Sequence, residues 1–419
     1  MTAQNINDLQ IKTQILPLFD FTININSKVV LHDIFNNSLN SIEAITHRQK
    51  ILEGFIQNNH LLDSYNYSFL SFNKAFNYLN SWHNPIPNTN LSFFSNKHVV
   101  SDVRDNIQLI LLFFSKLELY FNHINLKCFP KEYKEEIRYF QQFLKSFNLK
   151  VYTSSLRIRR LKFKELKNIC KHIDDLYKSN KISTFWDCLF RFEAYLSIAK
   201  GTCKHGFKFP EISPNSLDLK AFYHPSLSSP VKNNFKICNG VIVLNGANMS
   251  GKSTFLKAIG LCTYLGNLGL AIPADNNSTI PFCNYFSIGI NKFDDISNGY
   301  SHFMNEVISL KDTLVNAKDS KFCFAIFDEL FNGTDIDDAK LLIEKTISGL
   351  SKTTKGYFFI SSHLKNLNHL KNENITFYHM ECKLEDSQPM LTYKVKKGWS
   401  QINIGKILFD NEGLNELLG

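Results

Sequence analysis

Several features that would assign a protein to a class at once are missing from this chain of 419 residues. No two of its nine cysteines have the CxxC spacing of a zinc site, and their odd number does not suit a disulfide framework. The longest apolar run, Leu109 to Phe114, is much shorter than the ~20 residues that span a bilayer. The first residues lack the basic start and apolar core of a signal peptide. We therefore expect a cytoplasmic protein that does not enter a membrane.

A strong charge imbalance is also missing. Lys and Arg number 47 against 38 Asp and Glu, which gives a formal net charge of +9. This small excess permits contact with nucleic acid and does not require it. Hydrophobic residues at 44% and charged residues at 20% are ordinary values for folded proteins, so bulk disorder is not expected. The length predicts two or three domains.

The pattern of apolar residues and prolines changes near residue 205. Before that point, apolar residues recur at helical spacing in residues 42–56, 107–121 and 131–147. After it, prolines mark loops, and the β-rich run Gly240 to Leu244 leads into a glycine turn. We therefore predict two domains, an all-helical one over residues 1–205 and an α/β one over residues 206–419.

One stretch of the helical half is basic and amphipathic. Its cationic residues could form a solvated helix face, or a face that contacts phosphates. The sequence leaves both interpretations open. The residues are Arg157, Arg159, Arg160, Lys162, Lys164, Lys167 and Lys171.

The clearest motif follows the β-rich run and fits the P-loop pattern GxxxxGK[ST]. Gly246 and Gly251 allow the backbone to wrap closely around phosphate, so that successive N–H groups point at its oxygens. The start of the following helix adds partial positive charge. Lys252 would reach the β- and γ-phosphates, and the Ser253 hydroxyl would ligate Mg²⁺. The pattern thus predicts a site for ATP and Mg²⁺, formed by Gly246, Ala247, Asn248, Met249, Ser250, Gly251, Lys252, Ser253 and Thr254.

A P-loop needs a second strand that ends in acids, and residues 322–329 supply it. Six residues, apolar throughout, run into Asp328 and Glu329. Asp328 would hold the Mg²⁺ shell, and Glu329 would polarise the attacking water. The long spacing between Lys252 and Asp328 leaves room for an inserted subdomain, as in ABC-type ATPases.

A further apolar strand, residues 357–360, ends at His363. Ligands of α/β sheets bind at the carboxyl ends of the strands, where this histidine would lie. We therefore predict that His363 senses the γ-phosphate rather than serving a structural role. The predicted catalytic residues are Lys252, Glu329 and His363.

Together these motifs resemble the MutS family of DNA mismatch-repair ATPases. The Asn248-Met249 pair before Gly-Lys-Ser-Thr is the hallmark of that family's P-loop. Further similar segments follow in the family's order. They are Tyr223-His-Pro225, Ile288-Gly289 with Asp294-Asp295, Ser297 to Glu306 (the signature segment), Asp328 to Asp335, Ser362-His363 and Tyr378-His379-Met380.

The resemblance implies several properties beyond the motifs. His379 would lie near adenine, and two protomers would close head to tail so that Ser301 of one faces the nucleotide of the other. The partners would be a second copy of the chain and double-stranded or branched DNA. The helical half would correspond to the family's core and lever.

The sequence also departs from the family pattern. It has no counterpart of the mismatch-reading domain, which implies a short form that does not read mismatches. His302 and Ala247 replace a usual Thr and Pro, which affects expected rates more than nucleotide binding. We therefore expect a DNA-associated ATPase. The alternative is a nucleotide-gated dimeric scaffold that does not recognise DNA.

Overall fold

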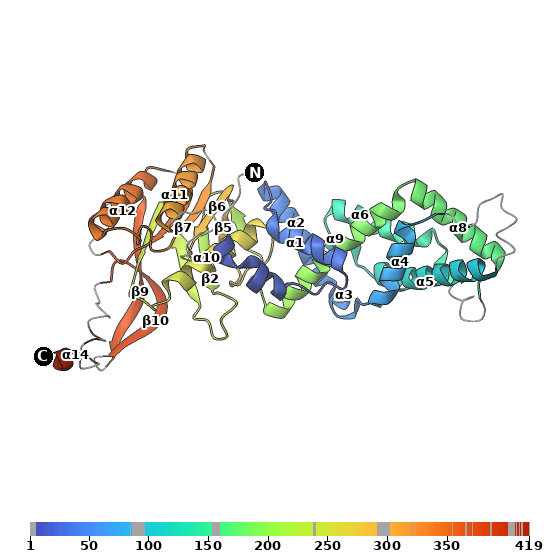
Figure 1. The fold of residues 1–419 in the computed structure, drawn as a ribbon, viewed down its shortest axis with the longest axis horizontal. Coiled ribbons are helices and arrows are strands. Elements are labelled where there is room, and N and C mark those ends of the chain that lie inside the picture. The colour runs from blue at the N-terminus through green and yellow to red at the C-terminus, as the bar shows by residue number, and fades with distance from the viewer. Residues whose placement is uncertain are drawn as a thin grey trace. The chain divides into compact units, whose positions relative to one another are not determined.

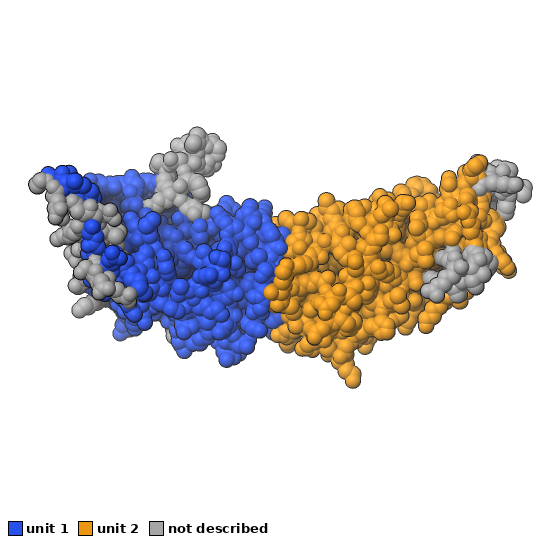
Figure 2. All heavy atoms as spheres, turned by 90° about the horizontal axis from the view of Figure 1, so that it is seen from below, with its two compact units in different colours: residues 1–18, 37–46, 205–419 blue, residues 19–36, 47–204 orange. Residues whose placement is uncertain are grey.

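The computed structural model describes most of the chain. The described residues are 6–83, 85, 97–152, 160–237, 240–290, 302–319, 321–353, 355–364, 367–370, 372–385, 388–400, 407, 409, 411 and 414–418. Two compact units are present, coloured blue and orange in Figure 2. Unit 1 comprises residues 1–18, 37–46 and 205–419, and unit 2 comprises residues 19–36 and 47–204.

Unit 2 is helical, as the sequence predicts (Figure 1). The predicted helices at 42–56, 107–121 and 131–147 are confirmed as α2, α5 and α6. The basic helix begins later than expected, at Phe163 of α8, and Arg157 and Arg159 lie outside the described residues. The helices are α1 (Ile25–Asn36), α2 (Ile42–Gln57, most of it in unit 2), α3 (Asn59–Ser64), α4 (Phe69–Asn80), α5 (Lys97–Asn122), α6 (Lys131–Lys145), α8 (Phe163–Lys178) and α9 (Lys181–His205).

Aromatic side chains fill the core of unit 2. Helix α9 is buried on all sides over residues 192–199, and its buried aromatic side chains include Phe185, Trp186 and Phe192. Phe185 stacks on Phe143 of α6 with ring centroids 4.3 Å apart. Such ring pairs add to the stabilisation that area burial already gives.

Unit 1 contains a six-stranded sheet with the order β10-β9-β4-β8-β7-β6. All neighbouring pairs are parallel except β9 and β10, which form an antiparallel hairpin. The strands are β4 (Gly240–Asn245), β6 (Tyr285–Gly289), β7 (Cys323–Phe327), β8 (Gly356–Ser361), β9 (Ile375–Glu385) and β10 (Gln388–Lys397).

Helices cover both faces of this sheet, which gives the layered α/β arrangement that parallel strands require (Figure 1). On one face Val241 and Val243 of β4 share an apolar cluster with Ile343 and Ile347 of α12. On the other face Tyr264 of α10 packs on Phe286 of β6 at 5.5 Å. The helices are α10 (Lys252–Asn267), α11 (His302–Lys318) and α12 (Ile336–Leu350), and the short α14 (Leu414–Leu418) lies near the C-terminus.

A smaller sheet with the order β1-β5-β2-β3 lies beside α10. Its strand β3 matters for the site, because Asn233 at its start bonds to the β10 strand. The strands are β1 (Glu211–Ser213), β2 (Leu217–Phe222), β3 (Asn233–Ile237) and β5 (Thr279–Pro281).

The start of the chain belongs to unit 1, which corrects the expected division at residue 205. The short turns η1 (Asn7–Leu9), η2 (Ile11–Ile15) and η3 (Leu16–Leu18) bury Leu9, Ile11 and Ile15. A Cβ added to Gly260 of α10 would lie 3.2 Å from Cδ2 of Leu9, so the two segments are in close contact. The Asp8 carboxylate accepts a hydrogen bond of 2.7 Å from the backbone N–H of Ile290.

No helix in the described part of the chain has the length and hydrophobicity of a membrane span. The described cysteines are thiols and form no disulfide. Cys203 is exposed and Cys128 half-buried, whereas Cys170, Cys188, Cys262, Cys283, Cys323 and Cys382 are buried, as small apolar residues would be.

Candidate functional site

The glycine-rich loop, residues 246–251, connects β4 to α10. Its backbone has positive φ angles at Gly246 (152°), Met249 (65°) and Gly251 (95°). A Cβ at Gly246 would lie 3.0 Å from Oγ of Ser250, so this position has no room for a side chain. Gly251 caps α10 in the left-handed conformation that suits glycine. The loop thereby presents the start of α10, with its N–H groups, to the cavity described below.

Lys252 lies in the first turn of α10 and is 6% exposed. Its Nζ donates hydrogen bonds to the carbonyl oxygens of Gly246 (2.9 Å) and Ala247 (3.0 Å). Burial lowers the pKa of Lys252, and the negative charges of Glu329 and Asp328 oppose this effect. The ammonium group thus lies at the loop, with two carboxylates close enough to affect its charge.

Asp328 directly follows β7, and its side chain is held by hydrogen bonds from α10 and from the end of β8. Its carboxylate accepts hydrogen bonds from the hydroxyls of Ser253 and Ser361. This arrangement is possible because β8 lies between β4 and β7, so all three strands end at the same edge of the sheet. A hydroxyl and a carboxylate in contact are the hard oxygen ligands that Mg²⁺ takes from proteins. The residues present therefore fit the magnesium site that the sequence predicts at Ser253 and Asp328.

Glu329 comes next and has a φ of 54°. Its N–H donates to Oγ of Ser361 at 2.8 Å. Its carboxylate accepts a hydrogen bond from Nε2 of His363 and another, of 3.2 Å, from the Asn332 amide. The acid and the histidine thus form a pair at the ends of adjacent strands, close to Lys252 and Asp328.

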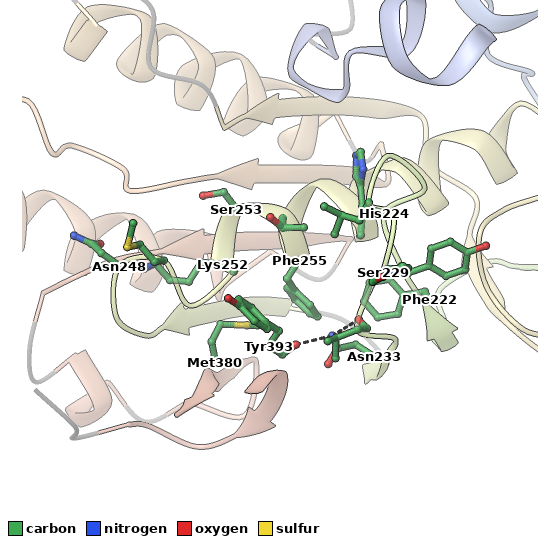
Figure 3. A pocket seen from close by; sticks show the side chains of 18 of the residues that line it. Phe222, His224, Ser229, Asn233, Asn248, Lys252, Ser253, Phe255, Met380 and Tyr393 are labelled. Carbon is green, nitrogen blue, oxygen red and sulfur yellow. Dashed lines mark hydrogen bonds between the residues drawn. The ribbon is translucent and has the colours of Figure 1, made fainter. Parts of the chain in front are cut away.

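A cavity of about 570 Å³ opens beside the glycine-rich loop (Figure 3). Figure 3 shows Asn248, Lys252 and Ser253 at one end of it, and Glu329 also lines it. Apolar and aromatic residues form much of the remaining wall. The other lining residues are Phe222, Tyr223, His224, Leu227, Ser229, Pro230, Val231, Asn233, Met249, Gly251, Thr254, Phe255, Ala258, Met380 and Tyr393.

The structure brings most of the predicted site residues together. Asn248, Met249, Gly251, Lys252, Ser253, Thr254 and Glu329 line the cavity, and Gly246, Ala247 and Ser250 complete the loop. Asp328 lies behind Ser253, and His363 lines a small hollow of about 50 Å³ next to Glu329. Ser301 and the signature residues 297–300 lie outside the described residues.

His379 is not brought to this cavity. Side chains of a strand alternate between its faces, and Met380 of β9 lines the cavity. His379 therefore faces the opposite side of the sheet, which it shares with Phe377 of the α12-side cluster. The sequence did not indicate Tyr393, which lines the cavity from β10.

Two residues of the Tyr-His-Pro segment, Tyr223 and His224, line the cavity. His224 is the more buried of the two. It is 8% exposed, and its Nδ1 accepts a hydrogen bond of 3.4 Å from the N–H of Ser226. Burial, with a smaller contribution from the charge of Lys257, lowers the pKa of His224 to about 4. The ring is thus neutral near pH 7.

Comparison with known proteins agrees with this geometry. Residues 242–410 match the family model described as MutS domain V. The chain is similar to the DNA mismatch repair protein MutS of Acholeplasma laidlawii, with 26% identity over 275 residues, covering 64% of this chain and 32% of that protein. It is similar to MutS protein homolog 4 of Mus musculus, with 30% identity over 253 residues (57% of this chain, 25% of that one).

The matched region thus spans a third or less of these relatives. Fold and site define an α/β domain with a glycine-rich loop and a pair of acids at the carboxyl edge of a mainly parallel sheet. The C-terminal part of this chain, residues 242–410, is thus similar to domain V of the MutS family.

Proposed function

We propose that this chain binds ATP with Mg²⁺ and hydrolyses it to ADP and phosphate. The observation that carries the proposal is the meeting of Lys252, Ser253, Asp328, Glu329 and His363 at one edge of the sheet, beside a cavity large enough for a nucleotide. The match of residues 242–410 to MutS domain V supports it, since the resemblance implies an ATPase.

Each residue has a separate task in the proposed reaction. The loop N–H groups and Lys252 bind the β- and γ-phosphates and offset their charge. Ser253 and Asp328 would hold Mg²⁺, which supplies further positive charge to the phosphates. The Glu329 carboxylate accepts a proton from the attacking water. His363 either donates to Glu329 or turns its Nε2 to a γ-phosphate oxygen, and so distinguishes ATP from ADP.

The test separates binding from turnover. Glu329→Gln keeps the shape of the side chain but cannot accept the proton, so ATP binding stays while phosphate release falls roughly 10²-fold or more. Lys252→Ala removes the cation and weakens ATP binding itself. Glu344→Gln is the matched control. Glu344, on α12, also pairs with a histidine, since its Oε1 lies 3.6 Å from Nε2 of His369. Wild-type turnover in Glu329→Gln, or no ATP binding by the unaltered chain, would contradict the proposal.

We further propose that the chain associates with DNA through phosphate contacts. Lys164, Lys167 and Lys171 of α8 are exposed at spacings that place them on one helix face, while Leu166, Ile169 and Ile173 are buried. A row of exposed ammonium groups attracts the phosphate backbone and does not read bases. The proposal therefore includes equal binding of matched and mismatched duplexes.

Head-to-tail pairing of two protomers, implied by the resemblance, belongs to the same proposal. A scaffold that binds nucleotide without DNA is the alternative, and a failure to bind any DNA at low salt would favour it.

A further inference from the structure

The turn that begins with the two acids, residues 328–334, has a strained backbone. Glu329 and Phe331 both carry a Cβ, and their φ angles are 54° and 61°. This left-handed conformation is unfavourable for such residues, so it persists only where surrounding contacts enforce it. The contacts that enforce it at Phe331 come from a different part of the chain, helix α11.

Helix α11 packs on strands β6 and β7 and holds Phe331 in two ways (Figure 1). The backbone N–H of Phe331 donates a hydrogen bond of 2.7 Å to Oε2 of Glu306. The Phe331 ring, which is buried, contacts the ring of Phe303 with centroids 5.7 Å apart. Phe303 and Glu306 are three residues apart, so they lie on one face of the helix. A carboxylate accepts a stronger hydrogen bond than a neutral group, and Glu306 thereby fixes the backbone of Phe331.

The residue after Phe331 links this contact to the proposed catalytic base. The Asn332 side-chain amide donates to Oε2 of Glu329 at 3.2 Å, and the Asn332 backbone N–H donates to the Glu329 carbonyl oxygen at 3.3 Å. The Glu329 carboxylate is thus oriented by His363 on one side and by Asn332 on the other. The position of Asn332 in turn follows from that of Phe331.

We propose that Glu306 is a positioning residue for Glu329, an inference that rests on the proposed function. Its bond to Phe331 keeps the turn in the strained conformation in which Asn332 reaches the Glu329 carboxylate. The described lining of the cavity does not include Glu306, so we expect it to affect turnover and not ATP binding. The resemblance directs Ser301 of the signature segment to the nucleotide of a second copy, whereas Glu306, the last residue of that segment, acts within its own protomer.

Two substitutions separate the reach of the Glu306 side chain from its charge. Glu306→Asp keeps the charge but is shorter by a methylene group, so its carboxylate no longer reaches the N–H of Phe331. Glu306→Gln loses the charge and keeps an acceptor oxygen at the same reach. Glu306→Asp should lower kcat for ATP about ten- to a hundredfold, the size of effect that a small displacement of a catalytic group has, and leave the Kd of Mg-ATP unchanged. Glu306→Gln should keep most of the activity.

Hydrogen exchange gives a second measurement, which does not depend on activity. The amide of Phe331 should exchange about tenfold faster in Glu306→Asp than in the unaltered chain, and Glu306→Gln should keep its protection. Glu344→Asp is the matched control, since it makes the same substitution at a half-buried position of another helix, α12. This control should change neither kcat nor the exchange of Phe331.

The possible outcomes separate this proposal from the proposed function. Unchanged kcat in Glu306→Asp would overturn the role of Glu306 and leave the proposed function intact. An equal loss of kcat in both Glu306 variants would also overturn it, since the charge and not the reach would then matter. So would weakened ATP binding in Glu306→Asp, or a loss of kcat without faster exchange of Phe331. If the unaltered chain did not hydrolyse ATP, the proposed function and this proposal would fall together.

Discussion

At the scale of single residues, backbone strain gathers at the cavity. Met249, Glu329 and Tyr393 all line it, and all have φ between 54° and 65°. For residues with a Cβ this conformation costs roughly 1–2 kcal/mol each. Strain of this kind persists only where surrounding contacts enforce it, and it is concentrated at functional sites. The strained backbone thus indicates the same functional site, the cavity beside the glycine-rich loop, as the side chains do.

His224 gives the first residue-scale prediction, a dependence of stability on pH. Its pKa is lowered by burial to about 4, against about 6.5 in an unfolded chain. Between these values the unfolded state binds more protons, so the free energy of unfolding falls as the pH falls from 6.5 to 4. The loss reaches about 3 kcal/mol at most. Denaturant unfolding at several pH values measures it.

His224→Asn cannot titrate and should lack this part of the pH dependence. His123→Asn, at an exposed position of unit 2, is the control and should keep it. The assignment to His224 would be wrong if the His224→Asn and wild-type curves ran parallel from pH 6.5 to 4.

At the scale of elements, two helical glycines predict opposite effects of one substitution. A Cβ at Gly266 of α10 would lie 2.0 Å from Cδ1 of Ile280, which is fully buried, and 3.0 Å from Pro210. Gly266→Ala should therefore destabilise unit 1 by about 1–3 kcal/mol through overpacking. Nothing lies within 4 Å of a Cβ at Gly349 of α12. Gly349→Ala should stabilise by about 0.5–1 kcal/mol through helix propensity.

Thermal unfolding of both variants checks the pair, and each serves as the control of the other. Destabilisation by both substitutions would mean that α12 needs its glycine for a reason other than space.

Some elements could be predicted from the sequence because their signals are local. The strands β4 and β7 are continuous apolar runs, and the loop between β4 and α10 has a fixed motif. The turns of residues 7–18 were not predicted, since the buried residues Leu9, Ile11 and Ile15 span too short a stretch for a sustained helical or strand period. The position of Tyr393 at the cavity was not predicted either, because it depends on a distant residue. The amide of Asn233, 160 residues earlier in the chain, donates a hydrogen bond to the Tyr393 carbonyl oxygen.

At the scale of the whole molecule, the net charge of +9 and the α8 lysines predict salt-dependent binding of DNA. Log K should fall by about 0.9 per contacted phosphate for each log unit of salt. Lys164, Lys167 and Lys171 changed together to Ala should lower this slope by about one for each lysine that contacts phosphate. Matched and mismatched duplexes should bind within roughly 1 kcal/mol of each other. A salt titration with matched, mismatched and four-way substrates measures both effects.

The matched control changes Lys50, Lys74 and Lys116 to Ala, which removes the same charge from three separate helices. An equal loss of slope in both triple variants would show that only net charge matters. A tenfold or greater preference for the mismatch would contradict the absence of base reading.

The division of the chain into two units also sets the order in which native contacts can form during synthesis. Residues 6–18 leave the ribosome well before the α10 and β6 segments that η1 contacts, which come more than two hundred residues later. At about 5–20 residues per second, this interval is on the order of tens of seconds. Unit 2 is complete at residue 204 and can fold meanwhile. Leu9, Ile11 and Ile15 therefore stay without their native contacts throughout that interval, which makes the segment of residues 6–18 a target for chaperones during synthesis.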